Sequence, residues 1–379
     1  MRIIFSITLV IILTTGIEAQ TKRVRDYGIT PGVLSPGRLN AITDVPGIKV
    51  GHTTLVSGVD IRTGVTAILP HSDNIYNLKV PAAIYIGNGY GKLTGISQVK
   101  ELGNIETPIV LTNTMSVPVA FNALISYTIN EPGNENVRSV NCVVGETNDA
   151  YLNDIRGRHI TEEHVLSAIR KASNGKVEEG NVGAGTGTVC FGFKGGIGTS
   201  SRLLPESLGG YTVGVLVQTN FGGVLQIDGV PVGEELGRFS FSRNVNSGAD
   251  GSCMIVVATD APVDARNLER VAKRAIMGLA RTGGIASNGS GDYVIAFSVA
   301  SENLIDSRER SPVSEREYLG NDGVSPLFLA AIEATEEAIL NSLFAAESMT
   351  GKDGHTINSL PLEEVLKIMR KYNNIIKDE

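Results

Sequence analysis

A serine that follows a glycine and directly precedes an apolar run is the first candidate for chemistry in this sequence. Ser252 follows Gly251, and residues 254–258 (MIVVA) predict a buried strand. Glycine lets the backbone bend without a Cβ clash, so the Ser252 hydroxyl could attack the Gly251 carbonyl and form an ester. Water would then release an amino-terminal serine, whose α-amine has a pKa of roughly 7.7–8.0 and could act as a base. An ordinary loop serine has the same local sequence, so both interpretations stay open.

Other polar side chains stand at strand ends and could assist such a nucleophile. Ser290 and Asp292 are two residues apart at the start of an apolar run, so an extended chain would project both side chains to one face. Asp292 could then orient Ser290, and Ser290 could contact the nucleophile. Asn220 ends the run 211–220, where its amide could donate to a developing oxyanion. Turns also favour Ser, Asp and Asn for local backbone bonding, so this simpler interpretation remains open for each.

Several other chemistries find little support. The Gly-rich stretches 87–92 and 183–200 lack the Gly-Lys-Ser/Thr end of a phosphate-binding loop, and we interpret them as turns and close backbone approaches. His159 and His164 lack a metal-ligand motif, and we expect neither a metal nor an organic cofactor. The odd cysteine count indicates no disulfide framework. Cys142 and Cys190 lie in apolar runs typical of buried hydrophobic residues, although one disulfide is possible in an oxidising compartment.

The elements around these residues alternate between strands and helices. After the strand at 254–258, Asp260-Ala-Pro262 is expected to open a helix with apolar residues at the spacing of one buried face, ending at residues 282–284. A polar loop over 287–292 then leads into a strand at 293–299. Further strands are predicted at 80–87, 108–111, 141–144 and 211–218, and further helices at 161–172, 325–346 and 361–372. Mixed elements of this kind predict a layered α/β or α+β architecture.

Composition and the first residues bear on location and partners. The chain has 379 residues with a net charge of -7, which argues against nucleic acid as a partner. Met1 and Arg2, the apolar run 3–12 and the small residue Ala19 follow the order of a secretory signal peptide, although a membrane anchor is the alternative. We therefore expect a signal peptide at 1–19, one catalytic domain at 20–379, a secreted or periplasmic location, and no membrane association after signal removal.

Several motifs together resemble the L-aminopeptidase/D-esterase family, which includes β-peptidyl aminopeptidases. The resemblance covers essentially the whole mature chain. The segment from Gly251 to Pro262 (GSCMIVVATDAP) is similar to the family's self-cleavage site. The other matching motifs are LNAITDVPG (39–47), VGHTT (50–54), GETND (145–149), GAGTG (183–187), FKGGIGTSSR (193–202), QTN (218–220), GLARTG (278–283) and NGSGD (288–292).

The resemblance implies a fold, a processing event and a set of roles. The fold would be a four-layer αββα sandwich of the N-terminal-nucleophile type, shared with ornithine acetyltransferases. The precursor would cut itself into an α chain (20–251) and a β chain (252–379), and such αβ units usually form homotetramers. Ser252 would be the nucleophile, Ser290 and Asp292 the pair behind it, Asn220 an oxyanion donor, and Tyr151 a hydroxyl near the oxyanion. The substrates would be short peptides, amides or esters with a free amino terminus.

Three alternatives follow from the same residues. Cys253 occupies a position that is usually aliphatic in this family, and it would be the nucleophile if cleavage fell one bond later. Counting back from the motif at 258–262 favours Ser252. The fold could also serve an acyltransferase that passes the acyl group to an amine, or an inactive periplasmic binding protein. The signal peptide argues against the acyltransferase, and the intact candidate residues argue against the inactive binding protein.

Overall fold

The computed structural model describes residues 23–242, 251–309, 311 and 313–374. The expected signal peptide at 1–19 lies outside these ranges. Within them, no helix is both long enough and apolar enough to cross a bilayer.

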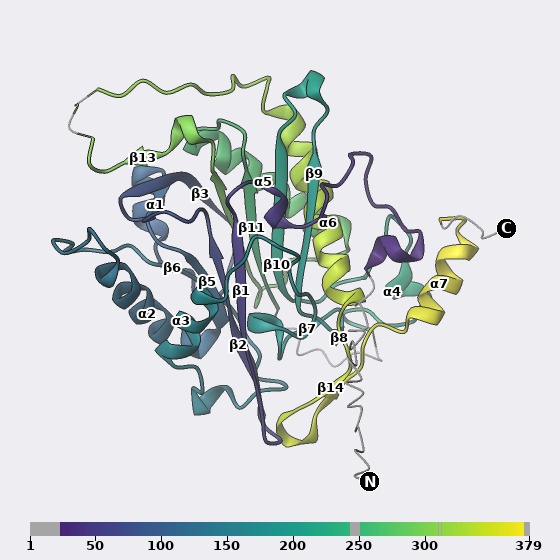
Figure 1. Cartoon of the computed structure of the whole chain (residues 1–379). Coiled ribbons are helices and arrows are strands. Elements are labelled where there is room, and N and C mark those ends of the chain that lie inside the picture. The colour runs from purple at the N-terminus through teal and green to yellow at the C-terminus, as the bar shows by residue number, and fades with distance from the viewer. Residues whose placement is uncertain (1–22, 243–250, 310, 312, 375–379) are drawn as a thin grey trace, which may run out of the picture.

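The core of the fold is a pair of β-sheets (Figure 1). The smaller sheet has the strand order β1 (Lys49–Ser57), β2 (Ile61–Leu69), β5 (Ile109–Asn113), β6 (Val143–Thr147). The larger sheet has the order β13 (Ile305–Asp306), β3 (Leu78–Gly89), β12 (Gly291–Ser298), β11 (Ser252–Thr259), β10 (Thr212–Asn220), β9 (Ile197–Leu203), with β4 (Asn104–Ile105) paired to β3. Two short hairpins, β7 (Val189–Cys190) with β8 (Phe193–Lys194) and β14 (Met349–Thr350) with β15 (Thr356–Ile357), stand apart from both sheets.

Helices cover the outer face of each sheet, which gives the described part of the chain an αββα layering. Helices α2 (Val117–Asn130) and α3 (Glu162–Arg170) pack on the smaller sheet, and α5 (Ala265–Arg281) and α6 (Ser325–Phe344) pack on the larger one. Apolar residues fill the spaces between successive layers in separate clusters. The remaining helices are α1 (Ile96–Leu102), α4 (Val232–Glu235) and α7 (Leu362–Lys371).

The structure confirms the predicted strands and helices, with one error at a helix start. Helix α5 begins at Ala265, not at Asp260, because the Asp264 side chain accepts the Asn267 N–H and caps the helix. The Asp260 carboxylate instead accepts the Thr212 N–H at the start of the neighbouring strand β10. All three cysteines are buried free thiols, so none of them forms the disulfide that the sequence left open.

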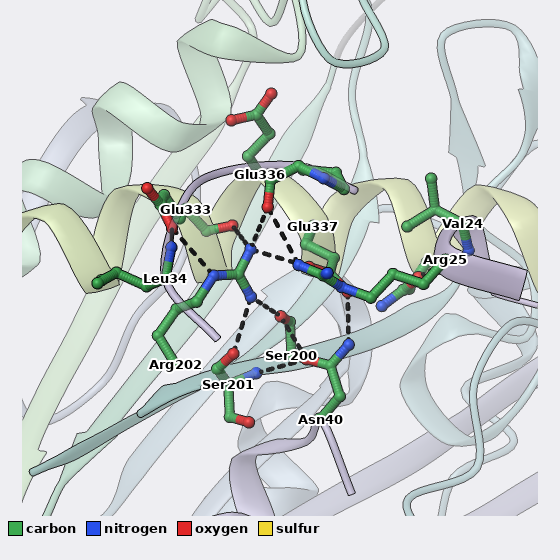
Figure 2. A network of polar contacts seen from close by, with 12 residues as sticks. Val24, Arg25, Leu34, Asn40, Ser200, Ser201, Arg202, Glu333, Glu336 and Glu337 are labelled. Atoms are coloured by element: carbon green, nitrogen blue, oxygen red, sulfur yellow. Dashed lines mark hydrogen bonds and ion pairs between the residues drawn. The ribbon is translucent and has the colours of Figure 1, made fainter. Parts of the chain in front are cut away.

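A buried charge network fastens the amino-terminal segment and β9 to α6 (Figure 2). The Arg202 guanidinium lies 3.1 Å from Glu333 Oε2 and 2.8 Å from Glu337 Oε2, and all three side chains are inaccessible to solvent. Arg25 adds a second guanidinium to Glu337 at 2.7 Å. Burial alone would raise the pKa of Glu337, but the bonds from Arg25 and Arg202 outweigh it and leave that pKa below its usual range. The Glu337 carboxylate is therefore held in its charged form.

Candidate active site

Three neighbouring strands of the larger sheet bring the candidate residues together. In the antiparallel pair β10–β11, Asn220 lies directly opposite Ser252. In the parallel pair β11–β12, Ser252 lies beside Gly291, which separates Ser290 from Asp292. The end of β10 and the starts of β11 and β12 thus meet at one end of the sheet. This register places residues from widely separated parts of the chain around the Gly251–Ser252 bond.

The Ser252 hydroxyl contacts the peptide bond that it is expected to cut. Its side chain is 5% exposed, and Oγ donates to the Gly251 carbonyl oxygen at 2.6 Å. The Gly291 N–H donates to that same carbonyl at 3.2 Å and to Ser252 Oγ at 3.3 Å. A Cβ on Gly251 would come within 2.8 Å of the Phe221 backbone, so only glycine fits here without a shift. The Ser252 hydroxyl, the Gly251 carbonyl that it would attack and the Gly291 N–H therefore lie within hydrogen-bond distance of one another.

Ser290 and Asp292 form the pair that their spacing predicts. Ser290 Oγ donates to Asp292 Oδ1 at 2.9 Å, and both residues are buried. Burial raises the pKa of Asp292 to about 6, while hydrogen bonds from Ser290 and from the Cys253 backbone oppose that rise. In the described residues of this uncut chain, Ser290 Oγ makes no hydrogen bond to Ser252, and the contact with Ser252 runs through the Gly291 N–H instead.

Asn220 is held in an orientation that leaves its amide nitrogen as a donor. Asn220 Oδ1 accepts the Val189 N–H at 2.9 Å, which assigns the oxygen and nitrogen of the side-chain amide. Among the described residues, Nδ2 donates to no other group. The side chain is buried beside Ser252, as an oxyanion donor would have to be. Sequence reasoning identified Asn220 but not Val189, since a backbone donor has no side-chain signature.

Cys253 is poorly suited to be the nucleophile. Its side chain is fully buried in the apolar cluster between the larger sheet and its helices. Burial, with Asp292 and Cys190 nearby, raises the pKa of its thiol well above the ordinary value. The thiolate is the reactive form of cysteine, so this environment disfavours attack. The geometry therefore favours Ser252.

Tyr151 lies in a more open position than the other candidates. Its ring is 47% exposed and stacks on His355 with the ring centroids 4.5 Å apart. His355 Nδ1 also bonds the Tyr151 carbonyl at 2.9 Å. Among the described residues, no hydrogen bond joins the Tyr151 hydroxyl to Ser252 or Asn220. Its expected place near the oxyanion stays a prediction.

Glu146 is a buried carboxylate near the start of β12 that the sequence analysis did not single out. Glu146, at the end of β6, is almost fully buried; its Oε1 accepts the Lys92 N–H at 2.9 Å and its Oε2 accepts the Thr114 hydroxyl. A Cβ on Gly91 would lie 3.0 Å from Glu146 Oε1 and 3.5 Å from the Gly291 Cα. The charges of Glu146 and Asp292 add to burial in raising the pKa of Tyr293. Its position in the GETND motif was the one sequence feature that could have identified Glu146 as a site residue.

The layering and the site together define a class of protein. A two-sheet sandwich covered by helices, with a serine at the start of a central strand and its hydroxyl on the preceding carbonyl, is the arrangement of an N-terminal-nucleophile hydrolase. Comparison with known families agrees, since the model of peptidase family S58 matches residues 40–357. The chain belongs to peptidase family S58, and it is a self-processing serine aminopeptidase of the N-terminal-nucleophile type.

Similar proteins support this assignment over nearly the full length. The β-peptidyl aminopeptidase BapA of Sphingosinicella microcystinivorans is 42% identical, over 96% of each chain. A β-aminopeptidase of Burkholderia sp. is 41% identical with a TM-score of 0.86, covering 92% of this chain and 99% of the other. The L-aminopeptidase D-Ala-esterase/amidase of Ochrobactrum anthropi, described as a variant of the Ntn-hydrolase fold, is 35% identical with a TM-score of 0.86, covering 93% and 99%. The chain is thus a hydrolase, and the alternatives of an acyltransferase and of an inactive binding protein are set aside.

Proposed function

We propose that this aminopeptidase removes amino-terminal β-amino-acid residues, together with small α-residues, from short peptides, amides and esters. The observation that carries the proposal is the contact of the Ser252 hydroxyl with the Gly251 carbonyl, which the Gly291 N–H also approaches. The preference for β-residues is supported by the named activities of the BapA and Burkholderia relatives. The acyl group is carried as an ester on Ser252.

Self-processing is the first step of the proposed mechanism. Ser252 Oγ attacks the Gly251 carbonyl carbon, and the Gly291 N–H stabilises the negative charge that forms on the carbonyl oxygen. The bond from Gly251 to the Ser252 nitrogen breaks, and the proton lost by the hydroxyl ends on that nitrogen. Water then hydrolyses the ester. The products are a chain that ends at Gly251 and a chain that begins at Ser252 with a free α-amine.

The same serine then acts on substrates. Ser252 Oγ attacks the carbonyl of the substrate's first residue, and both the Ser252 α-amine and Ser290, backed by Asp292, take part in removing its proton. Asn220 Nδ2 donates to the oxyanion, because Val189 holds the amide oxygen away. The leaving amine takes up the proton and departs, and water releases the acyl residue from Ser252.

An aminopeptidase must also recognise the free amine of its substrate. We assign this role to Glu146, which is buried, lies next to Gly91 and borders the strand segment of Gly291. A carboxylate there would pair with the substrate ammonium in a poorly hydrated site, where such a pair is stronger than in water. Lys92 and Thr114 already fix the two oxygens of this carboxylate.

Substrate hydrolysis tests the proposal directly. The purified, self-processed enzyme is expected to release p-nitroaniline from β-alanyl-p-nitroanilide with a kcat/KM at least equal to that for L-alanyl-p-nitroanilide. N-acetylation of the β-alanyl group removes the ammonium and is expected to lower kcat/KM by roughly 10²-fold or more, because it leaves a buried carboxylate unpaired. Equal rates on the acetylated substrate, or no release from either free amine, would contradict the proposal.

The raised pKa of Asp292 predicts a second feature of the activity. The carboxylate must be ionised to draw the Ser290 proton, so activity is lost as the pH falls through about 6. The Ser252 α-amine titrates higher, at roughly 7.7–8.0. The plot of log kcat/KM against pH is therefore expected to rise with unit slope between these values and to steepen below pH 6.

An Asp292→Asn variant isolates this titration. It is expected to lower kcat by roughly 10²-fold and to lose the steeper acid segment while keeping the upper one. A steep acid segment that persists in Asp292→Asn assigns the titration to another group. The sign for stability is opposite, because burial raises the pKa of Asp292 in the folded protein from its ordinary value of 3.8 to about 6. The stability that this group contributes is fully present below pH 3.8 and is lost as the pH rises through about 6.

Location and assembly complete the proposal. The order of basic, apolar and small residues over 1–19 supports export to the periplasm or beyond. Processing then leaves an α chain of residues 20–251 and a β chain of residues 252–379 that stay together. We propose a homotetramer of such αβ units, on the strength of the family resemblance.

A further inference from the structure

Lys194 is a fully buried lysine that the proposed mechanism does not use. It belongs to β8, in the hairpin that stands beside the candidate active site, and its side chain is 0% exposed. Nζ donates to the Gly185 carbonyl at 3.0 Å and to the Gly195 carbonyl at 2.7 Å. Within the described ranges, Lys194 forms no ion pair with a carboxylate. A buried amine on two backbone carbonyls is an uncommon arrangement, since buried charges are normally paired.

The charge state of Lys194 suits these two partners. Burial lowers the pKa of its ammonium to about 7, although the nearby Asp149 opposes the change. A neutral amine carries two N–H bonds, which equals the number of carbonyls that Nζ contacts. Lys194 can therefore donate to both carbonyls whether or not its amine is protonated. Both of its hydrogen bonds are made to backbone carbonyls.

The two carbonyls lie at the ends of the segment that orients Asn220. Between Gly185 and Gly195, the β7–β8 hairpin pairs Val189 with Lys194, and the Gly195 N–H closes it on the Thr188 carbonyl at 3.2 Å. Val189 is the residue whose N–H holds Asn220 Oδ1. Nζ thus spans the base of the hairpin that delivers this N–H.

We infer that Lys194 is a positioning residue, which keeps the 185–195 segment closed so that the Val189 N–H holds the Asn220 amide with Nδ2 toward the acyl oxygen. The inference rests on the proposed role of Asn220 as an oxyanion donor. Without the amine, the segment can open by small shifts of Gly185 and Gly195, and the Asn220 amide loses its fixed orientation. Preorganised donors of this kind lose much of their effect when they can rotate.

A double-mutant cycle on the self-processed enzyme tests the inference. Lys194→Met keeps the volume but removes both N–H donors, and it is expected to lower kcat on β-alanyl-p-nitroanilide roughly 10- to 100-fold with little change in KM. In an Asn220→Ala background the same substitution is expected to lower kcat less than about threefold, because there is no amide left to position. Both variants are expected to self-cleave, since the Gly251 carbonyl takes its N–H from Gly291.

Lys79→Met is the matched control. Lys79 is also largely buried, bonded at 3.1 Å to Glu106, but it lies on β3 away from the site. Its loss is expected to change melting temperature without changing kcat. If Lys194→Met lowers kcat equally in both backgrounds, or raises KM instead, the positioning role is wrong. If Asn220→Ala keeps full activity, Asn220 is not an oxyanion donor, and this part of the proposed function is wrong regardless of the result for Lys194.

A second variant covers the case that Lys194→Met does not fold. Lys194→Gln keeps N–H donors on a shorter side chain that cannot reach both carbonyls. It is expected to give a smaller fall in kcat that also disappears in the Asn220→Ala background. A fall that persists there overturns the inference.

Discussion

A Ser252→Ala protein is expected to remain one uncut chain and to have lost its peptidase activity by at least about 10⁴-fold. The substitution removes the oxygen that bonds the Gly251 carbonyl, so neither the ester with the chain nor the ester with a substrate can form. A denaturing gel and intact mass measure the first effect, and p-nitroanilide hydrolysis measures the second. Amino-terminal sequencing of the wild-type protein is expected to give Ser252-Cys253-Met254 from one of two chains.

The matched control for this result is Cys253→Ala. Cys253 is buried in the core, so its loss is expected to lower the melting temperature slightly and to leave cleavage and activity intact. The reverse pattern, an active and cleaved Ser252→Ala with an inert Cys253→Ala, would make the thiol the nucleophile. A Ser252→Ala protein with normal melting that still trims peptides would refute the ester mechanism altogether.

Asn220→Ala is expected to lower kcat by roughly 10²–10³-fold with a much smaller change in KM, which is the usual loss for one oxyanion donor. Asn220 Nδ2 acts only when charge develops on the acyl oxygen, so ground-state binding should change little. Steady-state kinetics on β-alanyl-p-nitroanilide provides the measurement, made after a gel has shown that the chain is cut.

An isosteric variant separates donation from packing. Asn220→Asp keeps an oxygen for the Val189 N–H but places a second acceptor where the donor was. It is therefore expected to be at least as inactive as Asn220→Ala. Near-normal kcat in Asn220→Asp would show that the side chain only holds the hairpin. As a control, Asn181→Ala removes another side-chain amide, bonded at 2.8 Å to the Glu347 carbonyl on the surface, and is expected to be fully active.

Local patterns predicted much of this fold because the residues that carry them interact with near neighbours in the chain. The apolar spacing in α5 and the run of residues in β11 each reflect one buried face, and both elements form where predicted. The start of α5 was misplaced because Asp260 and Asp264 are equally good caps by type. The choice between them depends on Thr212, which a distant strand brings to Asp260.

In the candidate site, too, contacts between near neighbours in the sequence could be predicted, and contacts between distant segments could not. The Ser290–Asp292 bond follows from spacing along one strand, and it forms as predicted. Glu146 lies on the other sheet, and Val189 and Lys194 lie on a separate hairpin. Their effects depend on a backbone N–H, on burial and on long-range topology, for which a single sequence gives no spacing rule. The resemblance to a family supplied roles for side chains but none for these supports.

The network around Arg202 has a consequence for the lifetime of the processed enzyme. Within the described residues, the Glu333 and Glu337 carboxylates bond only residues that precede the bond at 251–252, namely Arg25, Val33, Leu34, Asn40 and Arg202. Once that bond is cut, the fragments can separate only if all of these charged hydrogen bonds break together and the surface that buries them is exposed to water. Dilution alone would then release the fragments extremely slowly. Reassembly after full denaturation would become a second-order encounter, so the protein folds most easily while it is still one piece.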